Sequence, residues 1–344
     1  MRRLAGLVAL ALAAPAPAGA AARTAQPLVD VAPAATGFRD GVARHAARAF
    51  RATSFKPYAI PGGGAIDVGF SASYTPDDAI AGTYVGFLAS LPHGSELTRL
   101  AVYIAPPGEV QAACGGIEGT LACYDAQDHL MIVPGEQREG QGVSTSYVVT
   151  HEYGHHVAAF RSNRPLPAED FGPKYWSSRE RVCDRSARGR LAPGNETDRY
   201  LLNPGEGWAE AYARLKYPEQ PWTFTPLLTP DAAALAAARR DVEDPWTGSS
   251  RRTFRAHFTR RGSSTRTFRF DLKLDGPLSF RLTRPRGTRM AFTVSSLGKV
   301  RARDRTSSAV FSLACRQVRT ERVTVRLTRR SGGGTATIAV TRAG

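Results

Sequence analysis

His151, Glu152 and His155 form the pattern His-Glu-x-x-His, whose residue types and spacing suit a metal ion. On an α-helix, residues four apart project from one face about one turn apart, so both imidazoles can direct a ring nitrogen at the same ion. Glu152 lies beside them and can take a proton from a water that the ion has acidified. We therefore expect His151 and His155 to be ligands of a zinc ion (Zn2+) and Glu152 to be a general base.

The helix that must carry this pattern is predicted over residues 143–160. It contains no proline, follows a glycine-rich stretch and ends before Pro165, as a helix of this length should. Ser144 or Thr145 is expected to cap its first turn. The neighbouring His156 points away from the metal-binding face, so we expect it to pack in the core or on the surface.

A second motif, Asn-Pro-Gly-Glu-Gly-Trp-Ala-Glu at residues 203–210, resembles the segment that carries the glutamate ligand in gluzincin metallopeptidases. Together with the His-Glu-x-x-His pattern, it makes the chain similar to secreted bacterial zincin metallopeptidases. The resemblance implies Glu206 as the third zinc ligand and Glu210, one turn later, as the residue that orients a ligand histidine. The reverse assignment stays open, as does an aspartate ligand, for which Asp184 and Asp198 are candidates.

The metzincin pattern does not fit this chain. It requires a further histidine six residues after the second ligand, with a glycine between, and Arg161 and Ala158 occupy those positions. The apolar run at residues 130–134 resembles the zincin strand that borders the cleft and pairs with extended substrate. Tyr200 and Tyr212 flank the glutamate segment and are expected to be buried packing residues, with donation to an oxyanion as the alternative.

The N-terminus predicts export. Two arginines, an apolar run over residues 4–14 and the small residues Ala-Gly-Ala at 18–20 have the order of a secretory signal peptide, which we assign to residues 1–22. Residues 23–36 are rich in alanine and proline without periodicity, which indicates a flexible leader or a pro-segment. No apolar run is long enough for a transmembrane segment, so we expect a secreted, extracellular protein.

Four cysteines occur in the chain, and an oxidising compartment favours two disulfide bonds. Three pairings are conceivable, of which proximity favours Cys114 with Cys123, leaving Cys183 with Cys315. Closing the short loop stabilises a fold by roughly 2–3 kcal/mol. A thiolate that occupies the zinc and keeps the site latent is a chemical alternative that we set aside.

Pattern and charge divide the chain in two. Residues 37–244 mix helical stretches with short apolar runs, which indicates an α+β fold, here a zincin-like metallopeptidase domain. Residues 251–344 alternate apolar and polar side chains between turn residues, which predicts a small antiparallel β-sandwich. From Arg251 onward lie 23 of the 46 basic and 4 of the 30 acidic residues. Arginine-rich codon usage and an anionic cell-wall polymer as partner are the two interpretations of this excess.

These features favour a secreted zinc-dependent peptidase that hydrolyses peptide bonds in peptides or proteins, with Glu152 as general base. The alternative is an extracellular wall- or glycan-binding protein whose zincin-like domain is vestigial, against which the intact Glu152 argues. No nucleic acid is expected as a partner, because the basic segment lacks a recognition motif.

Overall fold

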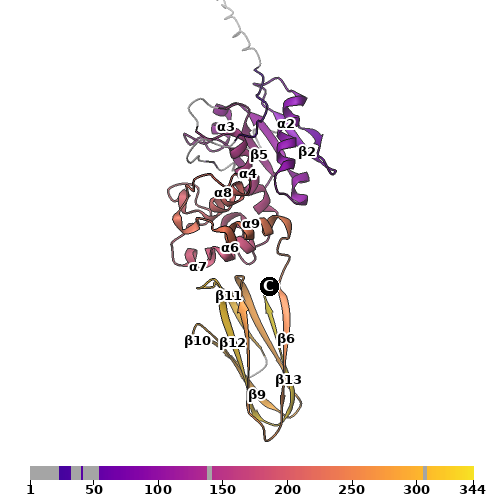
Figure 1. Ribbon diagram of the computed structural model, residues 1–344, viewed down its shortest axis with the longest axis vertical. Helices are drawn as coiled ribbons and strands as arrows, with labels where there is room; N and C mark the ends of the chain where they lie inside the picture. The colour runs from indigo at the N-terminus through magenta and orange to yellow at the C-terminus, as the bar shows by residue number, and fades with distance from the viewer. Residues whose placement is uncertain (1–22, 32–39, 42–53, 138–141, 305–307) are drawn as a thin grey trace, which may run out of the picture.

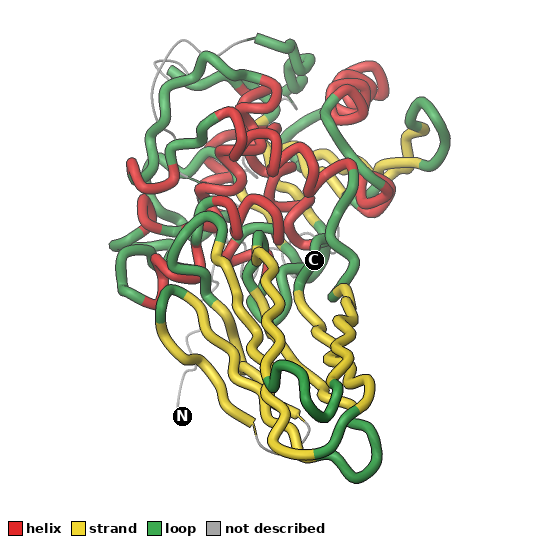
Figure 2. Tube along the Cα trace, turned by 60° about the horizontal axis from the view of Figure 1, so that its bottom comes forward, coloured by secondary structure: helices red, strands yellow, loops and turns green. Residues whose placement is uncertain are grey.

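The computed structural model describes residues 23–31, 40–41, 54–137, 142–304 and 308–344. The predicted signal peptide therefore lies outside the described residues, as do residues 32–36 of the predicted leader. Helices and a first sheet occupy one half of the molecule, and the strands of the second half project from it (Figures 1 and 2). The described residues contain no helix long and apolar enough to cross a membrane.

The first half is mixed α and β. Its strands are β1 (Lys56–Ala59), β2 (Ala65–Phe70), β3 (Ala101–Ala105), β4 (Cys123–Asp125) and β5 (Leu130–Pro134). Its helices are α2 (Asp78–Ser90), α3 (Pro107–Ala113), α4 (Thr145–Ala159), α5 (Ala168–Phe171), α6 (Lys174–Arg179), α7 (Val182–Ala187), α8 (Pro204–Lys216) and α9 (Ala232–Glu243), with short 3-10 turns η1 (Ser95–Arg99), η2 (Tyr200–Leu202) and η3 (Pro226–Leu228).

The sheet of this half has the order β1-β2-β3-β5-β4, with β2, β3 and β5 parallel and the two outer strands antiparallel. Successive side chains of a strand point to opposite faces. Val102 and Val133 accordingly join the large core that α4 and α8 share, whereas Tyr103 and Ile132 join a smaller core with α3. Both faces of β3 and β5 are therefore covered, which explains why these two strands consist of consecutive apolar residues.

Local sequence signals define the two helices that matter most for the site. The Ser144 hydroxyl accepts a hydrogen bond from the Tyr147 N–H at the start of α4, so of the two predicted caps the structure uses the serine. Asn203 caps α8 through its side-chain oxygen, and Pro204 takes the first helical position, where its missing N–H is harmless.

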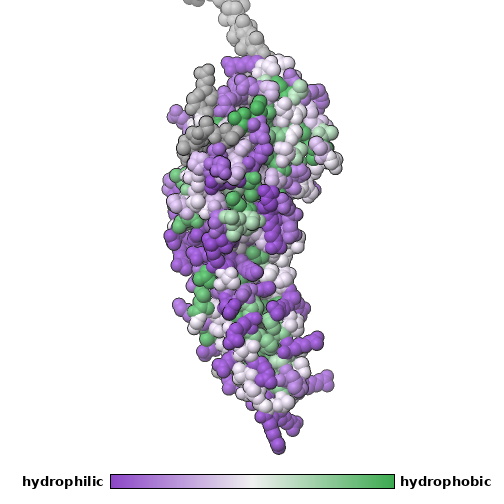
Figure 3. Space-filling model, viewed as in Figure 1, coloured by the Kyte–Doolittle hydropathy of each residue, from purple (hydrophilic) through white to green (hydrophobic). Residues whose placement is uncertain are grey.

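The second half consists of two antiparallel four-stranded sheets, which agrees with the prediction of an antiparallel sandwich. Their orders are β10-β9-β12-β7 and β11-β8-β13-β6. The strands are β6 (Ser250–Phe258), β7 (Thr265–Leu272), β8 (Gly276–Thr283), β9 (Arg289–Ser296), β10 (Lys299–Asp304), β11 (Ser308–Ala314), β12 (Glu321–Ser331) and β13 (Gly334–Arg342). Alternate side chains such as Phe280, Phe292 and Val325 form one core between the sheets, and hydrophilic side chains lie at the tip and project from the right-hand edge of this half (Figure 3).

The two halves are fastened together at the ends of α6 and α7. A disulfide joins Cys183 of α7 to Cys315, just after β11. The buried Lys174 ammonium donates to the Asp275 carbonyl at 3.1 Å, and the Asp275 N–H donates to the Ser178 hydroxyl at 2.9 Å. The sandwich therefore meets the helical layer through a buried polar contact and a covalent bond.

Residues 23–31 lie against the first half, which differs from the flexible leader that their composition indicates. Ala25 and Leu28 are buried in the large core, and Asp30 forms an ion pair of 2.6 Å with Lys216 of α8. Backbone hydrogen bonds from Arg23 to the Ser73 carbonyl and from Gln26 to the Gly135 carbonyl also hold this segment. Its alternative description as a pro-segment stays a prediction.

Candidate metal centre

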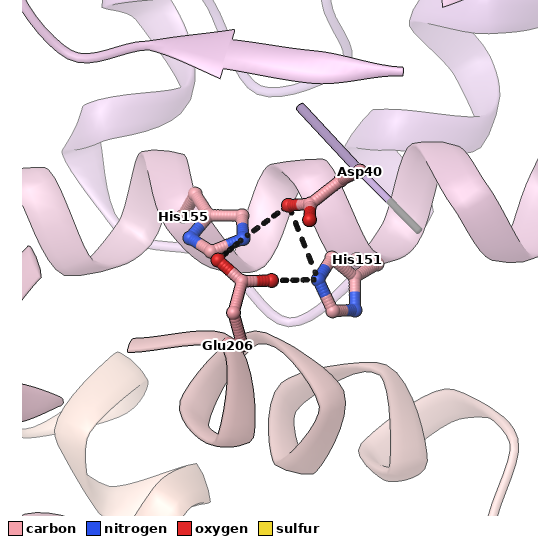
Figure 4. A group of neighbouring side chains, drawn as sticks. All are labelled: Asp40, His151, His155 and Glu206. Carbon is pink, nitrogen blue, oxygen red and sulfur yellow. Dashed lines mark hydrogen bonds and ion pairs between the residues drawn. The ribbon is translucent and has the colours of Figure 1, made fainter. Parts of the chain in front are cut away.

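Four side chains converge in the interior of the first half (Figure 4). Asp40, His151, His155 and Glu206 each offer one ligand atom, and these four atoms all lie within 4.8 Å of one another. His151 and His155 come from α4, Glu206 comes from α8, and Asp40 comes from the N-terminal part of the chain. Three of the four are buried and His155 is partly buried, so the group can hold a metal ion away from bulk water.

The distances within the group describe a small cage. The Glu206 carboxylate lies 3.3 Å from His151 Nε2 and 3.5 Å from His155 Nε2. Asp40 Oδ2 lies 3.1 Å from His155 Nε2 and 3.7 Å from His151 Nε2. Both histidines therefore present the same nitrogen, Nε2, to both carboxylates, as shared ligands of one ion would.

The close packing of α4 on α8 brings the ligands together. Gly154, the glycine of the motif, faces α8 so closely that a Cβ there would lie 2.9 Å from the Cα of Ala209. The indole N–H of the buried Trp208 donates to the Gly154 carbonyl at 2.8 Å. A glycine and an alanine at the crossing thus let Glu206 reach the two histidines on the neighbouring helix.

Glu152, the predicted general base, is buried beside this group. Among the described residues neither of its carboxylate oxygens has a hydrogen-bond partner. Burial raises the pKa of Glu152 well above its usual value, and the charge of Asp40 raises it further, whereas His155 and His151 lower it. A buried carboxyl without a partner is unfavourable for folding, and such groups concentrate where chemistry uses them.

Glu210 contacts His151 from the side opposite the cage. Its Oε2 lies 3.3 Å from His151 Nδ1, and the Tyr147 hydroxyl donates to its other oxygen at 2.5 Å. A carboxylate at Nδ1 fixes the ring orientation and directs Nε2 toward the cage. Glu206 thus belongs to the cage and Glu210 faces the other side of the His151 ring; the roles of ligand and orienting residue stay a prediction.

The charges of the group are strongly linked. Burial lowers the pKa of His151, but hydrogen bonds to Glu206 and Glu210 and the charge of Asp40 outweigh it and raise that pKa to about 10. Burial raises the pKa of Glu206, yet the two histidines hold it well below its usual value. A metal cation must therefore compete with protons for the imidazole nitrogens, so its binding releases protons.

A pocket opens onto the group from one side. Its described lining includes five acidic side chains and neither lysine nor arginine; the lining residues are Asp40, Gly41, Tyr124, Ala126, His155, Glu169, Asp170, Gly194, Glu196 and Glu206. The Tyr200 hydroxyl is close by, 2.5 Å from Asp40 Oδ1 and 3.0 Å from Glu206 Oε2. Tyr212 instead donates to the Pro92 carbonyl, so of the two flanking tyrosines only Tyr200 reaches the group.

Asp40 is the residue that the sequence did not indicate. It precedes His155 by 115 residues and belongs to no motif. The two aspartates considered from the sequence lie elsewhere: Asp184 forms an ion pair of 2.9 Å with Arg188, and Asp198 bonds to Asn195 at 3.2 Å.

Both disulfides expected from the sequence are present. Cys114 bonds to Cys123 and Cys183 bonds to Cys315, so all four cysteines lie among the described residues and each is paired. The first disulfide ties the end of α3 to β4 at the edge of the sheet. No thiolate is therefore offered to the metal centre.

Neither protein-family models nor curated proteins give a match to this chain.

Proposed function

We propose that the protein is an extracellular zinc-dependent peptidase. The observation that supports it best is the pairing of a buried cage of metal-ligand atoms with the buried, unpartnered carboxyl of Glu152. The two disulfides are compatible with an oxidising compartment outside the cell.

The donor set suits zinc. Imidazole nitrogens and carboxylate oxygens bind zinc tetrahedrally at about 2.0–2.1 Å, which places neighbouring ligand atoms about 3.3 Å apart. The separations between histidine nitrogens and carboxylate oxygens here are 3.1, 3.3, 3.5 and 3.7 Å. His151, His155 and Glu206 would hold the ion, which supplies Lewis acidity toward a water and a carbonyl.

The chain's own residues provide the proton transfers. Glu152 accepts a proton from the attacking water and delivers it to the leaving amine. Glu210 keeps the His151 ring in its binding orientation. The strand at residues 130–134, which the sequence suggested for pairing with substrate, is β5; it lies between β3 and β4 and has no free edge. We therefore place the substrate backbone along β4, one of the two outer strands of this sheet among the described residues, because an extended peptide can add to such an edge.

The test combines metal content with cleavage. Purified full chain is analysed for zinc and assayed on casein and a peptide library, with Glu152→Ala and the matched control Glu243→Ala. Glu243 is an exposed residue of α9 that pairs with Arg239. We expect about one zinc per chain in all three proteins and a loss of about 10²–10⁴-fold in cleavage for Glu152→Ala alone. Cleavage that persists in Glu152→Ala would contradict the proposal.

The sandwich is proposed to bind an anionic cell-wall polymer, on the strength of its charge. Its strand β6 at the sheet edge exposes Arg251, Arg252 and Arg255. Charged side chains on an edge strand also prevent pairing with other chains, so the proposal needs its own test. Replacing all three arginines with glutamine in the full chain should reduce the amount of protein retained on wall material. Retention of this variant should also change less with salt concentration than retention of the wild type. Equal, salt-insensitive retention of both proteins would contradict it.

A further inference from the structure

We propose that Asp40 keeps the metal centre latent by occupying the coordination position that substrate and water require. The inference rests on the proposed function, because it concerns regulation of that same site. The N-terminal part of the chain thereby inhibits the domain to which it belongs.

The number of ligands is the first step of the argument. A zinc ion in catalysis keeps three protein ligands and one open position, whereas four protein ligands close the coordination shell, as in structural sites. With Asp40 included, the group has four ligand residues. Glu152 can act on a water only when one of them withdraws.

The fold singles out Asp40 as the ligand that withdraws. His151, His155 and Glu206 are fixed on α4 and α8, whose crossing is too close for a Cβ at Gly154. Asp40 belongs to no helix or strand. Its carboxylate can therefore leave the group without separating the two helices that form the large core.

Asp40 and Gly41 also lie where a substrate backbone is expected. The Gly41 N–H donates to the carbonyl of Ala122 at 3.0 Å, directly before the outer strand β4. A Cβ on Gly41 would lie 2.1 Å from the carbonyl oxygen of Cys114. The chain thus approaches the cleft wall as closely as a glycine allows and takes a backbone hydrogen bond that a peptide substrate would use.

Two contacts hold the Asp40 carboxylate in place. The buried Tyr200 hydroxyl donates to Oδ1 at 2.5 Å, and Oδ2 faces His155 Nε2 at 3.1 Å. One oxygen is therefore oriented by the protein while the other is directed at the position of the ion. A carboxylate held in this way is preorganised as a ligand and needs little further ordering to bind.

The test uses the full chain loaded with cobalt(II), whose visible absorption reports coordination, and acetohydroxamate as a small probe that needs an open position. Wild type is compared with Asp40→Ala, Gly41→Ala and the control Asp78→Asn, which removes an exposed aspartate paired with Lys56. We expect the probe to bind Asp40→Ala at least about 10-fold more tightly than wild type. Gly41→Ala should shift in the same direction, because its Cβ displaces the segment without altering a ligand, and Asp78→Asn should match wild type.

Peptide cleavage by Asp40→Ala should rise about 10-fold or more and vanish when Glu152→Ala is added. Circular dichroism checks that both variants are folded. If neither folded Asp40→Ala nor folded Gly41→Ala binds the probe more tightly than wild type, the inference is overturned. A loss of cobalt from Asp40→Ala would also overturn it, because Asp40 would then be a permanent ligand. Improved probe binding without cleavage by any variant would support the latent centre and count against the peptidase.

Discussion

Gly154 on α4 and Ala209 on α8 lie so close that an added Cβ on the glycine would come within 2.9 Å of the alanine Cα. The contact occurs between the two histidines of the motif on one helix and after Glu206 on the other. Small residues at a crossing let two helix backbones approach, and here that approach sets the distance between metal ligands. A change in the distance between α4 and α8 would therefore change the distances between the side chains of the metal-binding group.

Gly154→Ala tests this relationship. The three heavy atoms nearest to the added methyl are the Ala209 Cα, the Ala209 carbonyl oxygen and the Tyr212 Cβ, none of which is the far end of a flexible side chain. We therefore expect an overpacking penalty of about 1–3 kcal/mol in the free energy of unfolding. Zinc affinity should fall as well, because α8 must move away from α4. Urea unfolding of metal-free protein and zinc competition with a chelator measure the two effects, with the exposed helical Gly82→Ala as control, since a Cβ there meets nothing within 4 Å. A variant that keeps full zinc affinity would contradict the link.

Glu152→Gln should abolish cleavage and at the same time stabilise the metal-free chain. The folded-state pKa of Glu152 is raised mainly by burial, so its ionisation opposes folding increasingly as the pH rises above the unfolded value of about 4.3. We expect a gain of about 1–3 kcal/mol at pH 7.5 that shrinks toward pH 4.5. Urea unfolding in EDTA at both pH values measures it, and a destabilised variant at pH 7.5 would refute the expectation.

Glu210→Gln should weaken zinc binding by about 10–100-fold while leaving the ligand set intact. The carboxylate that faces His151 Nδ1 at 3.3 Å would be replaced by a neutral amide. Tyr147→Phe, which removes only the hydroxyl that holds Glu210, should weaken binding less. Competition with a chromophoric chelator ranks the three proteins, and unchanged affinity in Glu210→Gln would show that the contact does not support the ligand.

His156 should make the protein sensitive to acid. Burial lowers its pKa to about 4, and the hydrogen bond to the Glu96 carbonyl raises it only in part. The ring lies between the Tyr124 hydroxyl and this carbonyl, each at 2.9 Å. The unfolded chain takes up this proton near pH 6.5, so stability falls as the pH drops from about 6.5 toward 4. The loss from this residue between pH 6.5 and 5 is about 2 kcal/mol. In His156→Gln the unfolding free energy should depend less on pH over that range; an unchanged slope would assign the effect to other groups.

The Cys183–Cys315 disulfide spans 132 residues of sequence, and closing so long a loop stabilises a fold by about 3–5 kcal/mol in the chain-entropy model. Replacing both cysteines with serine should lower the unfolding free energy by that order. Zinc affinity should stay the same, because neither cysteine belongs to the metal-binding group. Thermal unfolding and zinc competition measure the pair of effects, and weaker zinc binding would indicate that the junction supports the centre.

Helices and strands with a regular pattern of apolar residues could be predicted from the sequence. Elements and site residues that are placed by tertiary contacts could not. The uninterrupted window at residues 143–160 predicts α4, observed as Thr145–Ala159, and the alternation at Leu278 predicts β8. Glu206 follows His155 by 51 residues because α5, α6, α7 and η2 lie between them. These elements are only three to six residues long, too short to be stable without tertiary packing.

Asp40 could not be predicted from the sequence, because tertiary contacts alone place it at the metal-binding group. A histidine pair four residues apart carries its geometry in its spacing, because the helix fixes it. An aspartate that precedes its partner His155 by 115 residues carries none. Only the packing of the N-terminal chain against the Ala122 carbonyl and Tyr200 places it at the centre.

The junction between the two halves determines how the cleft would meet a surface. The base of the sandwich is held to the first half by more than the connecting chain. The Cys183–Cys315 disulfide and the hydrogen bond from Lys174 to Asp275 join the two halves, and the Lys174 ammonium also lies over the ring of Trp246. A polymer bound to the sandwich would therefore set both the distance and the direction of the metal centre relative to the wall.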